Sequence, residues 1–369
     1  YSGPAGARAT LRHPNVQAAV LETARGGLLR RGLACQSADV ALVTNISEDH
    51  FGEYGVFSLD DLANVKLSVA RGIRKGGTII LNAADPMLVK YGPAQSQRLA
   101  WFASDWDNAT LQEAIGNHQA VCAVRNQHLC LYANAQIYDL GAINDMPLSF
   151  QGLANYNIEN MAGAALAAYL LGVPAQIISQ TLLNFGVNRD DNPGRLQSWQ
   201  FADVRVLMDY AHNPEGMQGF LTIANAFKNA GRLAVLLGQA GNREDKDIQQ
   251  LAVTVANFNP DLVLLKDMLG YERGRVAGEV PALLKKNLLD CRLQEAQIEI
   301  CLDEVLAVLK LLAWAKPGDV IALPVHGLNE RYAVQCLLDA MQSSQWQAGQ
   351  SLPEQSEFTE STEKSDVSV

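Results

Sequence analysis

Two short polar segments follow apolar runs in distant parts of the sequence. TNISEDH (residues 44–50) comes after the run at 40–43, and DYAHNP (residues 209–214) closes the run at 204–208. Open α/β sheets bind their ligands at the carboxyl ends of strands. Carboxylates and imidazoles placed there can bind metal ions or hydroxyl groups, and the start of a following helix suits anions. The pair therefore suggests a nucleotide held between two domains.

Glu22 and His50 are the candidate metal ligands. Glu22 directly follows apolar residues 18–21, a predicted strand, and a carboxylate at a strand end suits a hard divalent cation. A neutral His50 imidazole at the next strand end would complete the coordination of a second metal. The alternatives are a surface glutamate and a packed or hydrogen-bonded histidine.

Lys66 and two asparagines are the other candidates in the first half. Lys66 lies in a helical pattern at 59–73, on the face away from the apolar side chains, where an exposed lysine is the ordinary interpretation. Asn157 and Asn160 are three positions apart near a helix start, so they share a face and could bind an adenine edge. Helix capping is the alternative.

Three candidates lie in the second half. Asn213 and Pro214 are typical of a helix start, so Asp209 and His212 should lie by the positive end of that helix. Asp209 could accept hydrogen bonds from ribose hydroxyls. Arg195, after a proline and a glycine, could bind phosphate with two parallel hydrogen bonds, although a surface arginine is the alternative.

Strands and helices must alternate to place these residues. Predicted strands cover residues 18–21, 40–46, 78–82, 99–103, 204–209, 233–237, 261–265 and 319–323. Helical patterns cover residues 59–73, 160–171, 214–228, 248–257, 279–289, 303–315 and 330–341. The alternation predicts an α/β fold with covered parallel sheets. Residues 121–140 alternate with period two about Asn126 and Gln127, which predicts a hairpin at an antiparallel edge.

Composition limits the class of protein. With 369 residues, 48% of them hydrophobic, the chain can fill two domains. A net charge of −10 argues against nucleic-acid partners and anionic membrane surfaces. Six cysteines without CxxC spacing suit the reduced thiols of a cytoplasmic protein. No apolar run is long enough to span a membrane, and the start does not resemble a signal peptide. We therefore expect a cytoplasmic protein.

Several motifs together resemble a known family. ETARGGLLRRGL, TNISEDH, NYNIEN, NPGRL, DYAHNPEGM and GNREDKDI occur in the order found in the Mur-ligase-like half of cyanophycin synthetases. The chain thus resembles the Mur ligase superfamily, with the muramyl peptide ligases and folylpolyglutamate synthase, over roughly residues 1–341. The resemblance implies a Mur ligase central domain at 1–192, mostly parallel with an antiparallel edge and without its first strand and P-loop. It also implies a Rossmann-like α/β domain at 193–345, and the polar composition beyond predicts a disordered acidic tail at 346–369.

The resemblance implies ATP-dependent amide formation with ATP and Mg²⁺ as cofactors. A carboxylate attacks the γ-phosphate, an acyl phosphate forms, and an amine displaces phosphate. In cyanophycin synthesis this half attaches arginine to an acidic polymer, so an amino acid and an acidic peptide or polymer are the expected partners. A muramyl-type or folylpolyglutamate-type ligase and an inactive nucleotide-binding relative are the alternatives. Since relatives often assemble, a homo-oligomer is also open.

The resemblance also assigns roles to residues. Glu22 and His50 match the magnesium ligands, and Lys66 matches a lysine that many relatives carbamylate. Asn157 and Asn160 match the adenine contacts, Arg195 a phosphate contact and Asp209 a ribose contact. His212 and Arg243, with Arg273 and Arg275, would face the active cleft from a mobile second domain.

One departure concerns the phosphate-binding loop. The relatives cradle ATP phosphates in a Gly-rich loop ending GKT or GKS, and this sequence has no GK[ST]. We expect that loop to lie upstream of Tyr1, so that the chain by itself hydrolyses little ATP. An ATP-grasp half, which cyanophycin synthetase also has, is not visible in this sequence.

Overall fold

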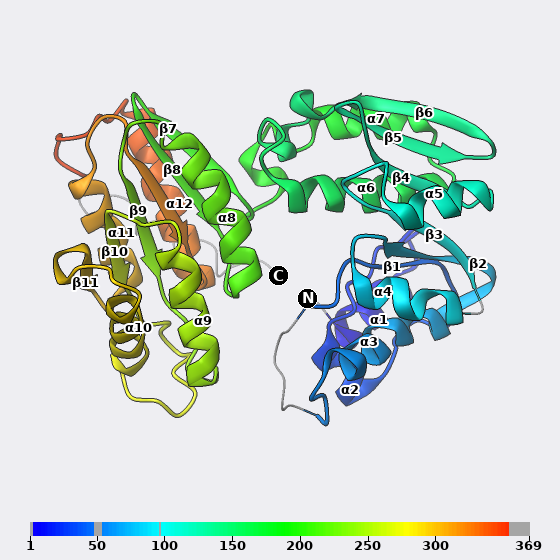
Figure 1. Ribbon diagram of the computed structural model, residues 1–369, viewed down its shortest axis with the longest axis horizontal. Coiled ribbons are helices and arrows are strands. Elements are labelled where there is room, and N and C mark those ends of the chain that lie inside the picture. The colour runs from blue at the N-terminus through cyan, green and yellow to red at the C-terminus, as the bar shows by residue number, and fades with distance from the viewer. Residues whose placement is uncertain (1–2, 48–53, 96, 354–369) are drawn as a thin grey trace. The chain divides into compact units, whose positions relative to one another are not determined.

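The computed structural model describes residues 3–47, 54–95 and 97–353. The chain divides into two compact units, Tyr1–Phe185 and Gly186–Val369, and each is described by itself (Figure 1). In the described residues, each unit has a six-stranded, mostly parallel sheet with helices on it, so the predicted α/β fold class is confirmed. None of the helices described is both long enough and apolar enough to span a bilayer.

The sheet of the first unit runs in the order β1-β2-β3-β4-β5-β6. Its strands are β1 (Ala38–Val43), β2 (Ile73–Asn82), β3 (Arg98–Phe102), β4 (Val121–Arg125), β5 (His128–Ala133) and β6 (Gln136–Ala142). Strands β1 to β4 are parallel, and β5 and β6 add an antiparallel edge. The predicted hairpin is confirmed. Asn126 and Gln127 have φ values of 51° and 65°, as the two central residues of a type I′ turn require.

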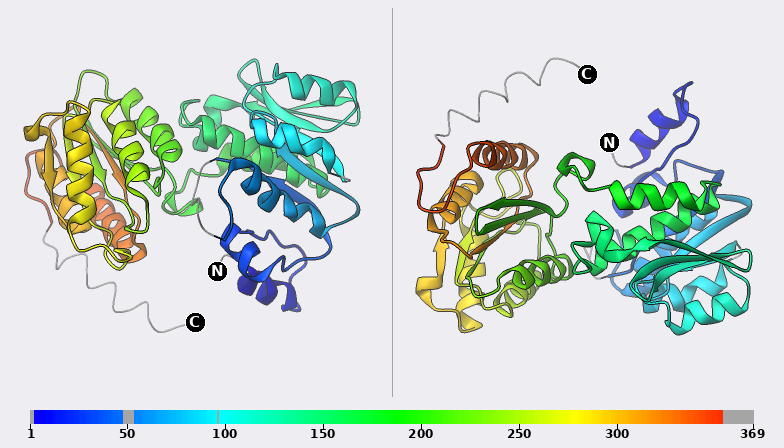
Figure 2. Two further views of the ribbon diagram at one scale, coloured as in Figure 1. Left: turned by 60° about the horizontal axis from the view of Figure 1, so that its bottom comes forward. Right: turned by 90° about the horizontal axis from the view of Figure 1, so that it is seen from above.

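Helices cover both faces of this sheet (Figure 2). Those on one face are α3 (Leu59–Leu67), α4 (Pro86–Tyr91) and α5 (Ala109–Gly116), and those on the other are α6 (Asn155–Leu170) and α7 (Ala175–Asn184). Helix α2 (Arg25–Arg31) packs on α3, and α1 (Pro4–Arg12) packs on α2. Because strand side chains alternate between faces, Ile79 and Leu81 pack in the cluster of α3, α4 and α5, whereas Ile80 packs in that of α6. Short 3₁₀ helices lie at Ser68–Gly72, Gly92–Ala94, Ile143–Asp145 and Pro147–Ser149.

The strand predicted at residues 18–21 is wrong. These residues are irregular, and the side chain of Val20 is 95% exposed. A strand needs a neighbour to complete its hydrogen bonds. Among the described strands β1 forms one edge of the sheet and pairs with β2 alone, so residues 18–21 do not extend the sheet beside it.

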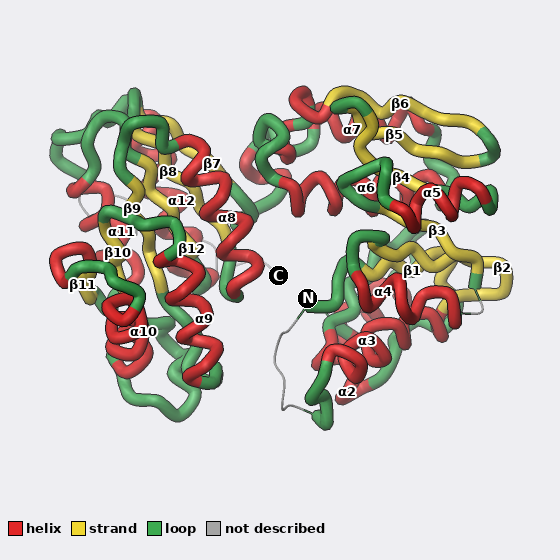
Figure 3. The backbone as a smooth tube through the Cα atoms, viewed as in Figure 1, coloured by secondary structure: helices red, strands yellow, loops and turns green. Residues whose placement is uncertain are grey.

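The sheet of the second unit runs in the order β11-β10-β9-β12-β8-β7 (Figure 3). Its strands are β7 (Gln197–Phe201), β8 (Val204–Asp209), β9 (Leu233–Leu237), β10 (Leu262–Leu265), β11 (Ile298–Ile300) and β12 (Val320–Pro324). All pairs are parallel except that of β7 with β8. Every residue of β9, LAVLL, is buried, as expected for a parallel strand covered on both faces.

Five helices pack on the two faces of this sheet (Figures 1 and 2), counting only the chain the structure describes. One face carries α8 (Pro214–Phe227), α9 (Asp245–Ala256) and α10 (Glu279–Asp290), and the other carries α11 (Glu304–Trp314) and α12 (Leu328–Ser343). Short 3₁₀ helices lie at Arg189–Asp191 and Glu295–Gln297.

The packed part of the second unit continues past the predicted tail boundary. Trp346 is 4% exposed, and Leu352 packs on the same core cluster. The indole finds an edge-on partner in Phe201, with ring centroids 5.7 Å apart. The disorder predicted from residue 346 is therefore contradicted up to residue 353. The polar composition of this segment led to the prediction, although Trp346 and Leu352 pack on the core. Residues 354–369 lie outside the described part.

Candidate functional site

The loop after β1 is tied to two neighbouring elements. Lys66, half-buried on α3, donates from Nζ to the carbonyl oxygen of Asn45 at 2.8 Å. The buried carboxylate of Asp85 accepts from the amide of Ile46 at 2.5 Å and from the first amides of α4, which it caps. The predicted candidate Lys66 thus lies beside the TNISEDH segment. His50 itself is outside the described residues.

Glu22 does not have the position that its predicted role requires. It is exposed in an irregular segment and not at the carboxyl end of a strand. The described residues contain no group of three or more His, Cys, Asp or Glu side chains that could hold a metal ion. Of the two predicted ligands, only this isolated carboxylate is described. The metal roles of Glu22 and His50 therefore stay predictions, and no chemical step is assigned to a metal here.

The two asparagines at the start of α6 differ in exposure. Asn157 is 7% exposed and donates from Nδ2 to the carbonyl oxygen of Leu148 at 3.0 Å, whereas Asn160 is exposed. Asn157 therefore holds the turn that precedes α6. Asn160 presents its amide to solvent, where it can meet a ligand.

Sequence reasoning missed the acidic group beside these asparagines. Glu159 accepts hydrogen bonds from Nδ2 of Asn82 at 3.0 Å, Oγ of Ser104 at 3.1 Å and Nδ2 of Asn155 at 3.1 Å. Asn82 ends β2 and Ser104 follows β3, so the first turn of α6 lies against the carboxyl ends of both strands. Polar residues at those two strand ends were the available signal.

Asp209 is the buried acid at the carboxyl end of β8. It is 7% exposed and accepts a hydrogen bond from the amide of Leu196 at 2.7 Å. Burial raises its pKa to about 6, although hydrogen bonds from the amides of Leu196, Ala211 and Tyr210 and the charge of Arg195 lower it. Its hydrogen bond to Leu196 ties the segment that enters β7 to the end of β8.

Two arginines and two histidines surround the ring of Tyr210, which directly follows β8. The guanidinium carbons of Arg195 and Arg331 lie 5.1 Å and 4.9 Å from the ring centroid. The rings of His212 and His326 have centroids 5.2 Å and 5.6 Å from it. The structure therefore brings together three of the predicted residues, Arg195, Asp209 and His212. Positive charge there suits an anionic ligand.

His212 is half-buried and is held through backbone contacts. The Nδ1 atom of His212 lies 3.1 Å from the carbonyl oxygen of Tyr210. The carbonyl oxygen of His212 accepts a hydrogen bond from Nε2 of Gln239 at 2.9 Å. The side chain of Asn213 accepts from the amide of Gly216, as predicted for a helix cap, and α8 starts at Pro214.

Behind this surface lies a buried polar cluster that the sequence did not predict. Lys266 forms an ion pair with Glu304 and places Nζ 3.1 Å from Nδ1 of His326. Nε2 of His326 lies 2.9 Å from the carbonyl oxygen of Ala211. Burial lowers the pKa of both Lys266 and His326, and the lysine charge lowers that of the histidine further. A neutral His326 that donates from Nε2 and accepts from Lys266 satisfies both contacts.

The arginines of the second unit have different positions. Arg243 is buried at 9% exposure, and its carbonyl oxygen accepts from Arg275 at 3.0 Å. Arg275 also donates to the carbonyl oxygen of Gly241 and pairs with Asp245 and Glu279. Its side chain therefore fastens the loop around Arg243 internally, whereas the resemblance suggested a place facing the cleft. Arg273, with a φ of 49°, is exposed and lies over the ring of Tyr271.

Comparison with known proteins agrees with the two-unit division. The Mur ligase middle domain family matches residues 5–168, and the Mur ligase, glutamate ligase domain family matches residues 194–323. The cyanophycin synthetase of Geminocystis herdmanii is 30% identical over 324 residues, which are 87% of this chain and 36% of that protein. That of Trichormus variabilis is 31% identical over 88% of this chain and 36% of its own length.

Solved structures agree on the fold. MurF from Acinetobacter baumannii has a TM-score of 0.58 at 17% identity and covers 89% of this chain and 66% of its own. FolC from E. coli, in complex with ADP, has a TM-score of 0.57 at 18% identity and covers 83% of this chain and 63% of its own. The chain spans about 36% of the length of the cyanophycin synthetases it matches. It belongs to the Mur ligase superfamily and carries a Mur ligase middle domain followed by a Mur ligase glutamate ligase domain.

Proposed function

We propose that this chain takes part in ATP-dependent amide bond formation of the cyanophycin synthetase type. Its similarity to those enzymes runs through both units, and the FolC structure that shares its fold holds ADP. The structural observation that carries the proposal is the buried carboxylate of Asp209 at the carboxyl end of β8, directly before the amino terminus of α8. This is the position at which α/β sheets bind nucleotides.

The proposed reaction has two steps. A substrate carboxylate oxygen attacks the γ-phosphorus of ATP, the bond to the β,γ-bridging oxygen breaks, and ADP leaves. An amine then attacks the carbon of the acyl phosphate and loses a proton, and inorganic phosphate leaves with its oxygen. Both steps concentrate negative charge on phosphate oxygens, so neutralising cations matter more than an unusual nucleophile.

The second unit would supply the ribose contact and part of the positive charge. Asp209 would offer a carboxylate oxygen at the carboxyl end of β8 as the acceptor for a ribose hydroxyl. Arg195 is exposed, so its guanidinium can turn from the ring of Tyr210 to a phosphate with two parallel hydrogen bonds. His212 and Arg243 are proposed to act on the reacting groups from this unit.

The first unit would supply the adenine contact and a lysine. Asn160 is exposed and would bind the adenine edge, while Asn157 shapes the turn beside it. Lys66 holds Asn45 at the end of β1, where a cation or its carbamylated form would position the groups that react. Magnesium, with Glu22 and His50 as ligands, is part of the proposal only through the family resemblance.

Substrate identity can be tested by phosphate release with the full-length protein. ATP, an aspartate-rich peptide and arginine should together release phosphate, and mass spectrometry should find arginine joined to the peptide. Omission of either acceptor or amine is the control, and lysine in place of arginine tests selectivity. Turnover with a muramyl peptide or a folate instead would favour the other ligase types. The absence of phosphate release across the whole panel would favour an inactive relative.

A further inference from the structure

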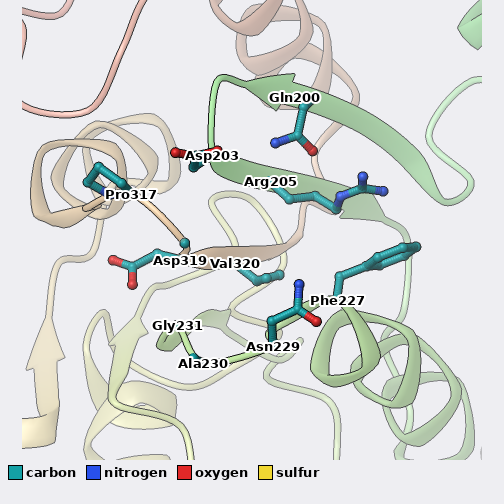
Figure 4. A pocket seen from close by; sticks show the side chains of 11 residues that line it. Gln200, Asp203, Arg205, Phe227, Asn229, Ala230, Gly231, Pro317, Asp319 and Val320 are labelled. Carbon is teal, nitrogen blue, oxygen red and sulfur yellow. The ribbon is translucent and has the colours of Figure 1, made fainter.

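A hollow of about 610 Å³ lies at the amino-terminal end of the sheet of the second unit (Figure 4). It is lined by the β7–β8 turn, the end of α8 and the loops that enter β9 and β12. Asp209 ends β8 and the hollow adjoins the start of that strand, so the two places lie at opposite ends of the sheet. A volume of roughly 300–1,000 Å³ is typical of small-molecule sites.

Arg205 is the positive group of this hollow. It is half-buried, and its guanidinium carbon lies 4.0 Å from the centroid of the Phe227 ring. Burial lowers the pKa of this arginine, so its charge has lost part of its hydration. Its guanidinium makes no hydrogen bond or ion pair with any other residue that the structure describes. The aromatic ring covers one face of the guanidinium and leaves the N–H groups at its edge open to a ligand.

The carboxylates of the hollow do not neutralise this charge. Asp319 pairs with Arg232, whose Nη2 lies 2.5 Å from Oδ2 and whose Nε lies 3.2 Å from Oδ1. It also accepts from the amide of Lys316 at 2.8 Å. Asp203 is exposed in the β7–β8 turn, and Figure 4 shows its carboxyl group at the side of the hollow away from the guanidinium of Arg205.

A neutral side chain completes the wall on the side of Arg205. Asn229, with a φ of 45°, lies across the hollow from Arg205 next to Phe227, and its amide makes no hydrogen bond with the described residues (Figure 4). On the side of Arg205 the wall therefore offers a guanidinium, an amide and an aromatic ring, whereas the Asp203 carboxylate lies on the far side and that of Asp319 is paired with Arg232.

We propose that this hollow binds a small organic carboxylate. The carboxylate would accept two parallel hydrogen bonds from the guanidinium of Arg205, because its planar N–H donors favour this geometry. It would accept a third hydrogen bond from the amide of Asn229. The volume exceeds what an inorganic ion needs, so a carbon body of several atoms fits alongside. This inference is independent of the proposed function, because amide formation uses the other end of the sheet.

Succinate is the probe for a calorimetric titration of the full chain. We expect saturable binding at one site, at least tenfold weaker in Arg205→Gln. Succinamide, which has the same shape without charge, should not bind. Lys286→Gln removes one positive charge from an exposed position on α10 and should leave succinate affinity unchanged.

A second variant guards against misfolding of Arg205→Gln. Asn229→Asp tolerates the positive φ and places a carboxylate opposite Arg205, so it should also weaken succinate binding at least tenfold. Equal succinate affinity in the parent and in both folded variants would overturn the proposal. Equal binding of succinamide would do the same, and inorganic phosphate binding more tightly than succinate would overturn the assignment to carboxylates.

Discussion

The ammonium group of Lys266 lies 3.1 Å from Nδ1 of His326, and both side chains are buried at strand ends of the second unit. The same lysine pairs with Glu304 at the start of α11, and His326 contacts the carbonyl oxygen of Ala211. One buried cation thus connects β10, β12 and α11 to the loop that carries His212. The position of the loop that carries His212 therefore depends on the buried side chains of Lys266, Glu304 and His326.

Removal of the lysine should destabilise the fold strongly. Lys266→Met keeps the length of the side chain and leaves Glu304 buried without its cation, which typically costs about 3–5 kcal/mol. Urea unfolding of the variant should show a loss of this size. The double variant Lys266→Met with Glu304→Gln should recover part of it. A single variant as stable as the parent would show that Glu304 is satisfied without the lysine.

Asp209 should make stability depend on pH. Its pKa is raised to about 6 in the folded state, above the ordinary value of 3.8, so the folded state holds the proton more tightly than the unfolded state does. This contribution is fully present below pH 4 and is lost as the pH rises through 6. The stability of Asp209→Asn relative to the parent should therefore increase by about 2 kcal/mol between pH 4 and pH 7. Parallel pH curves for the two proteins in denaturant titrations would contradict this assignment.

The same acid should contribute to nucleotide binding. Asp209→Ala in the full-length protein should weaken ATP binding roughly tenfold or more, the usual effect of losing a hydrogen bond to a charged group. Asp290→Ala, on the exposed end of α10, is the matched control and should bind ATP as the parent does. Calorimetric affinities decide the matter, and unchanged ATP affinity in the first variant would remove the ribose role.

Lys66 should matter more for turnover than for folding. Lys66→Ala removes the contact with Asn45 and the charge beside the TNISEDH segment. We expect turnover of the full-length protein to fall roughly 10²-fold, the order found when one preorganised electrostatic group is lost. Lys75→Ala, at an exposed position of β2, should have normal turnover. Steady-state phosphate release measures both, and similar rates in the two variants would exclude a role for Lys66.

The polar cluster around Glu159 should stabilise the first unit. Glu159→Ala leaves the side-chain donors of Asn82, Ser104 and Asn155 without their acceptor, and a loss of about 1–3 kcal/mol follows if they stay dry. Glu159→Gln keeps one acceptor oxygen and should lose less. Thermal and urea unfolding compare the two variants. Equal stabilities would show that water replaces the glutamate.

Local signals in the sequence were sufficient for much of the fold. The cap and proline at Asn213 and Pro214 fixed the start of α8, and the continuous apolar run of β9 marked a covered parallel strand. Residues 18–21 are equally apolar, yet they form no strand because strand formation depends on a neighbour and not on composition alone. The edge strands β7 (QSWQF) and β11 (IEI) went unpredicted, since neither is a continuous apolar run.

The candidate site shows the same division between local and long-range information. Arg195, Asp209 and His212 were selected as candidates because each follows a recognisable break or strand end. Lys266 pairs with a glutamate 38 positions away and a histidine 60 positions away, and no local pattern records such a contact. The contacts of Arg275 went unpredicted for a related reason, because three of its four oxygen partners lie on a segment about 30 positions earlier in the sequence.

The indole of Trp346 lies beyond the last turn of α12 and yet fills the core beside Phe201. The end of α12 is therefore held against the core by the residues that follow it. Shortening the chain to Ser344 would leave a void the size of an indole in the core. The end of α12 would then fray and become a site of proteolysis. Purification tags are best attached after Pro353, where they leave the packing of Trp346 and Leu352 intact.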